Sequence, residues 1–173
     1  IDIPPLDNSA MDGYALRAED TRGAGESSAR YLVVVGEVAA GSMPTEEVRS
    51  GTAIRIMTGA PLPEGADAVV QFEDTDEVDR KSSREDLSHI GILCQAEKGL
   101  NVRCRGEDIA RGQLVLEKGK VLRPQEIGVL ASLGHSTALV IRRPIVAILA
   151  TGDELIDGDQ PLAPGKIYDS NTY

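Results

Sequence analysis

Residues that interrupt regular structure recur along the whole chain, and their spacing limits the fold more than any other feature. The 173 residues include 18 glycines and 9 prolines, so the helices and strands between them must be short. Aromatic residues make up only 3% of the chain, with one Phe and no Trp. The core must therefore consist of Val, Leu, Ile and Ala, several of which favour strands, in one domain or two small ones.

Local patterns predict a series of strands and one clear helix. Segments of strand type lie at 31–39, 52–57, 67–72, 91–96, 101–104, 113–117, 138–141 and 145–150. A helix is predicted from Pro124, which suits a first turn, to Leu133, because Gly134 suits the position after a last turn. The charged, serine-rich segment 78–89 is expected to be an exposed loop.

Charge and cysteine content exclude some classes of protein. The net charge of −10 argues against nucleic acid as the main partner, because phosphate backbones require basic patches. Cys94 and Cys104 are too few for a disulfide framework or a zinc site, so we expect reduced, partly buried thiols in a cytosolic protein. No apolar run approaches the length of a membrane span. The chain starts without Met and stops at a typical helix N-cap within 169–173, so we expect a fragment of a longer protein.

Four short clusters combine glycine with acidic or hydroxyl side chains, a composition typical of ligand-binding loops. The clusters are the segments 7–14, 57–61, 105–108 and 151–154. Glycine gives each loop backbone freedom, so together the loops predict one site assembled from distant segments. Asp12, Asp108 and Glu154 are candidate oxygen ligands for Mg²⁺, and the hydroxyl of Thr58 is a candidate donor to phosphate.

Each cluster also has an ordinary structural interpretation. Asp12 can satisfy its own backbone in a turn, Thr58 can end a strand, and Asp108 can form a weak ion pair with Arg103 or Arg105. The last cluster differs because it follows a buried-type strand directly, where α/β proteins bind ligands. Residue types and spacing alone therefore favour an acidic Mg²⁺–phosphate site and do not name a reaction.

The longest motifs resemble one known family. They are the segments 3–15 (IPPLDNSAMDGYA), 54–70 (IRIMTGAPLPEGADAVV), 103–109 (RCRGEDI) and 151–155 (TGDEL). In this order they resemble the MoeA family, the molybdopterin molybdenumtransferases, which includes the E domain of gephyrin. The resemblance implies a mixed, mainly β fold of α+β type. In that fold, 1–15 and 117–143 form an elongated dimerisation domain, 16–116 form an inserted mostly-β domain, and 144–173 begin an α/β pterin-binding domain with its first strand.

The resemblance also implies an activity. Family members insert molybdenum from molybdate into adenylylated molybdopterin, with Mg²⁺ and release of AMP, as the last step of molybdenum cofactor biosynthesis in the cytoplasm. The family's catalytic residues match this sequence at Asp12, Thr58, Asp108 and Glu154, of which the three acids would bind metal. A loop near the pterin matches Asp169, Ser170 and Asn171.

Partners and alternatives follow from the same resemblance. We expect a homodimer that receives its substrate from an upstream molybdopterin-adenylylating protein. The family's basic phosphate- and molybdate-binding residues do not lie within these 173 residues, so the chain alone is expected to be inactive. Two other classes remain open: a gephyrin-like scaffold that binds peptides, and an acidic Mg²⁺-dependent phosphohydrolase.

Overall fold

The computed structural model describes residues 1–83 and 87–172, which form two compact units, 1–134 and 135–173. The strands are β1 (Asn8–Ser9), β2 (Gly13–Leu16), β3 (Arg30–Val38), β4 (Thr52–Ile56), β5 (Ala68–Gln71), β6 (His89–Ile92), β7 (Val102–Arg103), β8 (Leu155–Ile156) and β9 (Ile167–Tyr168). The helices are α1 (Glu77–Ser83) and α2 (Pro124–Ser132), with short 3-10 turns η1 (Ala18–Thr21) and η2 (Phe72–Asp74). The expected mixed, mainly β fold is confirmed.

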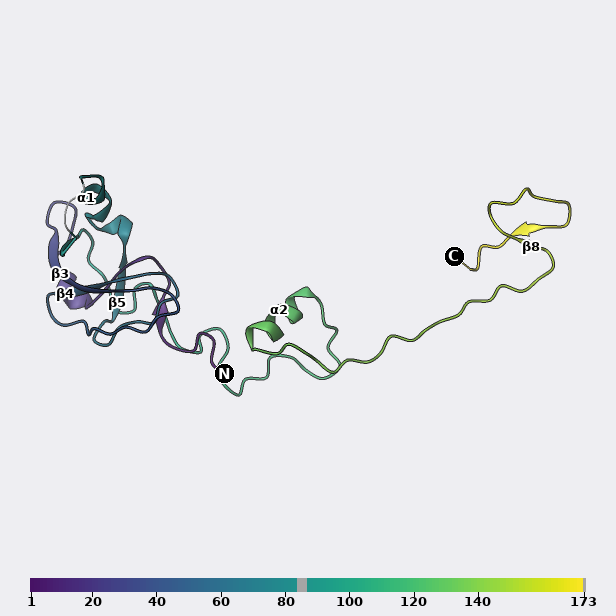
Figure 1. Cartoon of the computed structure of the whole chain (residues 1–173), viewed down its shortest axis with the longest axis horizontal. Helices are drawn as coiled ribbons and strands as arrows, with labels where there is room; N and C mark the ends of the chain where they lie inside the picture. The colour runs from purple at the N-terminus through teal and green to yellow at the C-terminus, as the bar shows by residue number, and fades with distance from the viewer. Residues whose placement is uncertain (84–86, 173) are drawn as a thin grey trace. The chain divides into compact units, whose positions relative to one another are not determined.

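A five-stranded sheet organises the first unit. Its strand order is β5-β2-β4-β3-β6, and Figure 1 shows β3, β4 and β5 grouped together with α1 beside them. β2 runs antiparallel to both β4 and β5, whereas β3 runs parallel to β4 and antiparallel to β6. β2 is therefore an inner strand, and it begins at Gly13, three residues before the expected start of the inserted domain at 16.

Apolar side chains cover both faces of this sheet. Along β2, Tyr14 and Leu16 belong to one buried cluster, while Ala15 belongs to the other. This alternation follows from the two-residue period of a strand. All four residues of β2 are buried, which is why the segment has no polar face.

The first residues of the chain pair with a segment about 100 positions later. Ile3 and Ile109 form an antiparallel bridge, and the N–H groups of Asp108 and Ile109 donate to the carbonyl oxygen of Ile3. The Asp2 carboxylate accepts a hydrogen bond from Arg105 Nε at 2.7 Å. Next along the chain, β1 pairs with β7, so the segments 2–9 and 102–111 lie side by side.

The predictions made from local patterns succeed where the strands have partners. The strands expected at 31–39, 52–57 and 67–72 are confirmed as β3, β4 and β5, and the helix expected at 124–133 is confirmed as α2. The strand expected at 91–96 starts two residues earlier, as β6. The one expected at 101–104 is reduced to β7.

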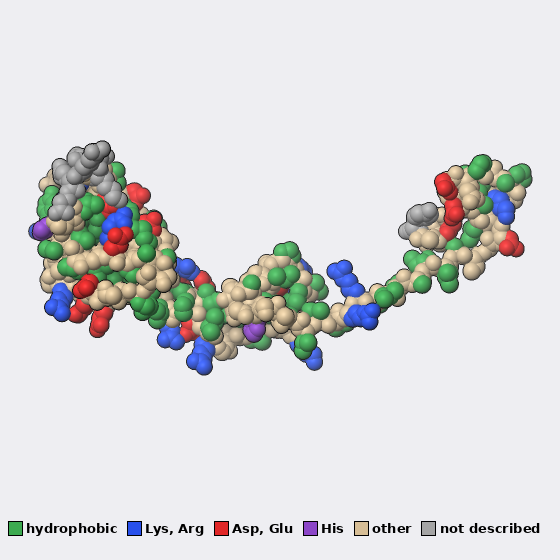
Figure 2. Space-filling model, in the orientation of Figure 1, with side chains coloured by type: hydrophobic (Ala, Val, Ile, Leu, Met, Phe, Trp, Pro, Cys, Tyr) green, Lys and Arg blue, Asp and Glu red, His purple; other side chains and the backbone are tan. Residues whose placement is uncertain are grey.

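Three predicted strands are wrong. No strand forms at 113–117, 138–141 or 145–150. A strand needs ladder hydrogen bonds to a neighbouring strand, and no other described segment forms a ladder with these three. Leu139, Ile141 and Ile145 are instead 85% or more exposed, and Figure 2 shows apolar side chains at the surface of the second unit. That unit contains a short parallel pair, β8 and β9.

The loop expected over 78–89 is also corrected. Residues 77–83 form helix α1, and β6 begins at His89; residues 84–86 lie outside the described part of the chain. Polar contacts rather than an apolar stripe anchor this helix, since Glu77 is buried and Val78 is 56% exposed. Among the described residues, no helix combines the length and the apolar content needed to cross a bilayer.

Candidate functional site

Asp12 and Thr58 come together although they are 46 positions apart. The backbone N–H of Thr58 donates to Asp12 Oδ1 at 2.7 Å, and its hydroxyl donates to the same oxygen at 2.8 Å. Both residues are exposed. Asp12 Oδ2 accepts no hydrogen bond from the described residues, so this carboxylate presents one oriented oxygen to solvent.

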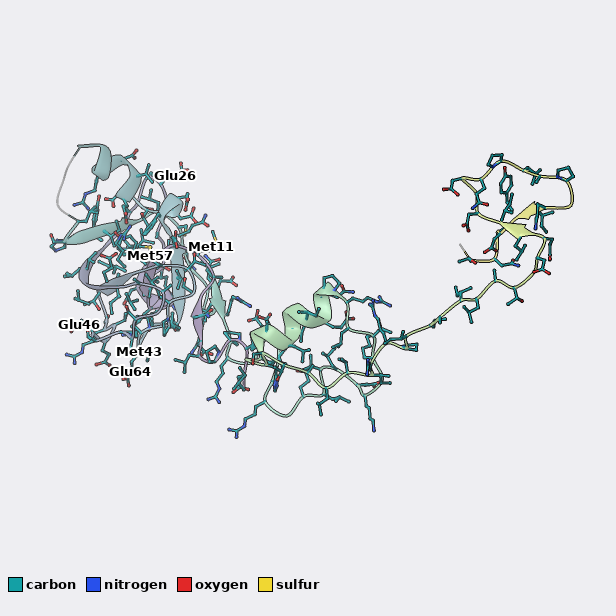
Figure 3. The ribbon with its side chains drawn as sticks, turned by 45° about the vertical axis from the view of Figure 1, so that its right-hand side comes forward. Met11, Glu26, Met43, Glu46, Met57 and Glu64 are labelled. Carbon is teal, nitrogen blue, oxygen red and sulfur yellow. The ribbon has the colours of Figure 1, made fainter. Side chains whose placement is uncertain are left out.

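The register of the sheet explains this contact. Asp12 directly precedes β2, and Thr58 follows β4 by two residues. The antiparallel ladder pairs Gly13 with Ile56, so both loops leave the sheet at the same end. Figure 3 labels Met11 and Met57, which precede Asp12 and Thr58 in these loops.

Close packing fixes the two loops against each other. The N–H of Gly59 donates to the carbonyl oxygen of Ser9 at 2.8 Å, and the N–H of Ser9 donates to that of Ala60 at 3.0 Å. Gly59 has φ 81°, a left-handed conformation that glycine adopts without strain. Gly13 approaches β5 so closely that a Cβ would lie 2.0 Å from the carbonyl oxygen of Val70. The glycines of both motifs therefore permit the approach of Asp12 to Thr58.

The hydrogen bonds also set the charge of Asp12. They lower the pKa of Asp12 below its ordinary value of 3.8, with the backbone N–H of Thr58 as the largest cause, its hydroxyl second, and the positive charge of Arg55 as a smaller one. Each of these interactions favours the ionised form. Asp12 is thus a carboxylate at neutral pH.

Asp108 lies in the same unit but has a different partner. Its Oδ2 contacts Arg103 Nη2 at 2.5 Å, as the ordinary structural interpretation predicted. The two side chains are 50% and 41% exposed, so the pair contributes at most about 1 kcal/mol. The backbone of this loop is firmly held, since the N–H of Arg105 donates to Asp7 Oδ1 at 2.7 Å.

Glu154 and the expected pterin loop lie in the second unit. Glu154 is exposed beside β8, and its carboxylate lies over Gly152, where a Cβ would come within 2.5 Å of Oε2. Asp169 Oδ1 accepts hydrogen bonds from the N–H groups of Asn171 and Thr172. The Thr172 hydroxyl, as the largest cause, and the Asn171 N–H lower the pKa of Asp169.

The expected metal ligands are divided between the two units. Within residues 1–83 and 87–172, no group of three or more His, Cys, Asp and Glu side chains is arranged to hold a metal ion. Asp12 offers one oxygen, Asp108 is paired with Arg103, and Glu154 belongs to the other unit. Asp12 by itself nevertheless fits Mg²⁺, which is often bound through one or two carboxylates together with substrate phosphates and water.

Sequence reasoning missed a buried polar network beside the loops. The carboxylate of Glu77, on α1, is 1% exposed and accepts hydrogen bonds from Tyr14 Oη at 2.5 Å and from Arg55 Nη2 at 3.1 Å. Burial and the hydrogen bond to Glu77 raise the pKa of Tyr14. Nothing in the local sequence indicated this contact, because Glu77 stands at the start of a charged stretch.

The two cysteines are free. Cys94 is partly buried, as expected, and burial raises the pKa of its thiol, with the charge of Asp74 a smaller cause. Cys104 is exposed, so the prediction of a partly buried thiol is wrong there.

The fold and the loops define a mostly-β module that presents an oriented, ionised carboxylate at the end of its main sheet. Residues 1–134 match the family described as the MoeA N-terminal region (domain I and II). The chain therefore belongs to the MoeA family.

Known relatives agree with this assignment over nearly the whole chain. Molybdopterin molybdenumtransferase 2 of Mycobacterium tuberculosis is 41% identical over 99% of this chain and 40% of the relative. The molybdopterin molybdenumtransferase of Staphylococcus aureus is 42% identical over 98% of this chain and 39% of the relative. A crystal structure of the molybdopterin biosynthesis MoeA protein from Pyrococcus horikoshii OT3 superposes with a TM-score of 0.81, at 40% identity, over 99% of this chain and 44% of that one. The chain thus spans about 40% of its curated relatives' length.

Proposed function

We propose that this chain contributes part of the active site of a molybdopterin molybdenumtransferase. The enzyme would insert molybdenum from molybdate into adenylylated molybdopterin and release AMP. The observation that carries the proposal is the Asp12–Thr58 pair, in which two motifs of the family meet through hydrogen bonds of 2.7 and 2.8 Å. The names of the relatives support the choice of reaction.

The catalytic residues are proposed to be Asp12, Thr58, Asp108 and Glu154. Thr58 orients Asp12 and keeps it ionised, so that Oδ2 faces the incoming ligand. The exposed Arg103–Asp108 pair is weak enough for a ligand to displace. Asp169, Ser170 and Asn171 are proposed to contact the pterin.

Mg²⁺ is the proposed cofactor, and it would be held by Asp12 with Asp108 and Glu154. When bound, it would neutralise charge on the adenylate phosphate as AMP leaves. Asp12 suits this role because its ionised state is already secured by Thr58. The single oxygen that it offers leaves room for phosphate and water in the metal's coordination shell.

The surrounding biology is proposed on the same basis. The protein would act as a homodimer in the cytoplasm and would receive adenylylated molybdopterin from the enzyme that forms it. We also propose that 1–15 and 117–143 form the dimerisation domain, 16–116 the inserted domain and 144–173 the start of the pterin-binding domain. Residues 1–134 match a family region described as domain I and II, which supports two domains before the proposed pterin-binding domain.

Complementation tests the proposed reaction. The complete gene that encodes this chain should restore molybdoenzyme activity in a bacterial strain that lacks its own molybdopterin molybdenumtransferase. Asp12→Ala should lower the restored activity about 100-fold or more. The matched control, Glu26→Ala, changes another exposed acid (Figure 3) and should restore normally.

Each outcome bears on a different part of the proposal. Failure of the unchanged gene would contradict the transferase and favour a scaffold or a phosphohydrolase, whereas full restoration by Asp12→Ala would show that Asp12 is not catalytic. The 173-residue chain alone should produce no cofactor from molybdate, Mg²⁺ and adenylylated molybdopterin, because it spans only 40% of a relative's length.

A further inference from the structure

The Glu77 carboxylate ties together the two strands that carry the candidate site. Its Oε2 accepts a hydrogen bond from the hydroxyl of Tyr14 on β2, and its Oε1 accepts one from Nη2 of Arg55 on β4. Tyr14 and Arg55 are direct partners across the ladder, so their side chains lie on one face of the sheet. A buried carboxylate without partners is strongly unfavourable, which fixes all three groups in one arrangement.

This arrangement lies within a few residues of the Asp12–Thr58 pair. Asp12 is two residues before Tyr14, and Thr58 is three residues after Arg55. Because the backbone between them is the antiparallel ladder itself, the separation and twist of β2 and β4 determine where both loops begin.

Phe72 makes a second connection between the network and Asp12. The guanidinium of Arg55 stacks over the Phe72 ring with Cζ 4.4 Å from the centroid, and Tyr14 meets the same ring edge-to-face at 5.7 Å. The N–H of Phe72 donates to the carbonyl oxygen of Asp12 at 3.2 Å. Movement of Arg55 would therefore disturb the backbone of Asp12 as well as β4.

We propose that Glu77 is a positioning residue that sets the geometry of the Asp12–Thr58 pair through Tyr14 and Arg55. Its importance for catalysis rests on the function proposed above. Its importance for the pair is independent of the reaction and can be measured in the 173-residue chain. A residue that only stabilises the fold would affect all amides of the sheet alike, whereas a positioning residue affects the pair selectively.

Amide hydrogen exchange by NMR separates these two roles. In Glu77→Gln, the Thr58 N–H should exchange about tenfold faster, corresponding to the loss of one hydrogen bond, after normalisation to the Val69 N–H. Val69 is buried on β5, at the edge of the same sheet, and its N–H donates to the carbonyl oxygen of Leu100 at 2.9 Å. The matched control is Glu37→Gln, which also removes a partner of Arg55 but is 59% exposed and belongs to neither β2 nor β4. It should leave the ratio unchanged.

A second variant covers the case in which Glu77→Gln does not fold. Tyr14→Phe removes only the hydroxyl that donates to Glu77 and should raise the same ratio in the same direction. Equal acceleration of Thr58 and Val69, or no change at Thr58, in the folded variant would overturn the proposal. A selective effect combined with failed complementation would leave Glu77 as a positioning residue and refute only the transferase function.

Discussion

At the scale of single residues, Asp12 accepts two hydrogen bonds from one threonine, and these determine how its charge responds to pH. Both bonds favour the carboxylate, so its pKa in the folded chain lies below 3.8. A group with a depressed folded pKa contributes stability above its unfolded pKa and loses it as the pH falls through the folded pKa. The Asp12–Thr58 interaction should therefore be intact at neutral pH and disappear only in acid below about pH 3.8.

The variant Thr58→Val should move the pKa of Asp12 part of the way back toward 3.8. The movement is partial because the backbone N–H, the larger cause, remains. An NMR titration of the Asp12 carboxyl carbon measures it. Thr52→Val is the matched control, since Thr52 lies at the other end of β4 and bonds to Arg49. An unchanged pKa in Thr58→Val would show that the hydroxyl does not interact with Asp12.

Sequence reasoning found these residues but not their contact. Asp12 and Thr58 stand out locally because each adjoins a glycine in a polar loop. Their hydrogen bond depends on the pairing of Gly13 with Ile56, a register that no local pattern encodes. Glu77 and Tyr14 are 63 positions apart in the sequence, and neither residue type predicts a buried contact across such a separation.

At the scale of elements, local patterns succeed where an element's own residues determine it. β3, β4 and α2 have clear β-branched or capping patterns, and they occur close to where those patterns predict them. The apolar run at 145–150 has the same pattern, but a strand also needs a partner. For helix α1 the error is the reverse: local patterns predicted a loop where a helix forms. This helix is anchored by the long-range contacts of Glu77 rather than by an apolar stripe.

Substitution of Gly13 tests how closely β2 must approach β5. Gly13→Ala would place a Cβ 2.0 Å from the carbonyl oxygen of Val70, so the strands must separate or the fold must open. We expect a loss of more than about 3 kcal/mol in the free energy of unfolding, measured with urea.

Gly128→Ala is the control for that substitution. Gly128 lies within α2, and nothing stands within 4 Å of its Cβ position. Alanine there should be neutral or stabilising by up to about 1 kcal/mol, because it is the better helix former. Equal stability of Gly13→Ala and the unchanged chain would contradict the close approach.

At the scale of the whole molecule, the candidate residues are divided between two compact units. Asp12, Thr58 and Asp108 lie within 1–134, and Glu154 lies within 135–173. We propose that in a symmetric dimer each active site combines the first group from one chain with Glu154 of the other. A twofold axis would then create two equivalent shared sites.

Mixed dimers of two inactive variants test this arrangement. In the complete protein, Asp108→Ala and Glu154→Ala should each fold and be nearly inactive. Heterodimers purified through two different tags should regain about half of the wild-type activity, because both substitutions fall in one site and leave the other intact. Heterodimers as inactive as either parent would mean that each chain carries its own complete site.

The pairing of the first residues with 102–111 has a consequence for the order of folding. The hydrogen bonds from Arg105 to Asp7 and Asp2 join residues 98 and 103 positions apart. Closing so long a loop costs chain entropy before any contact compensates for it, so we expect these bonds to form after the strands in between have brought the two segments together. We therefore expect the loop that carries Asp108 to become ordered late in folding, after the sheet that positions Asp12 and Thr58.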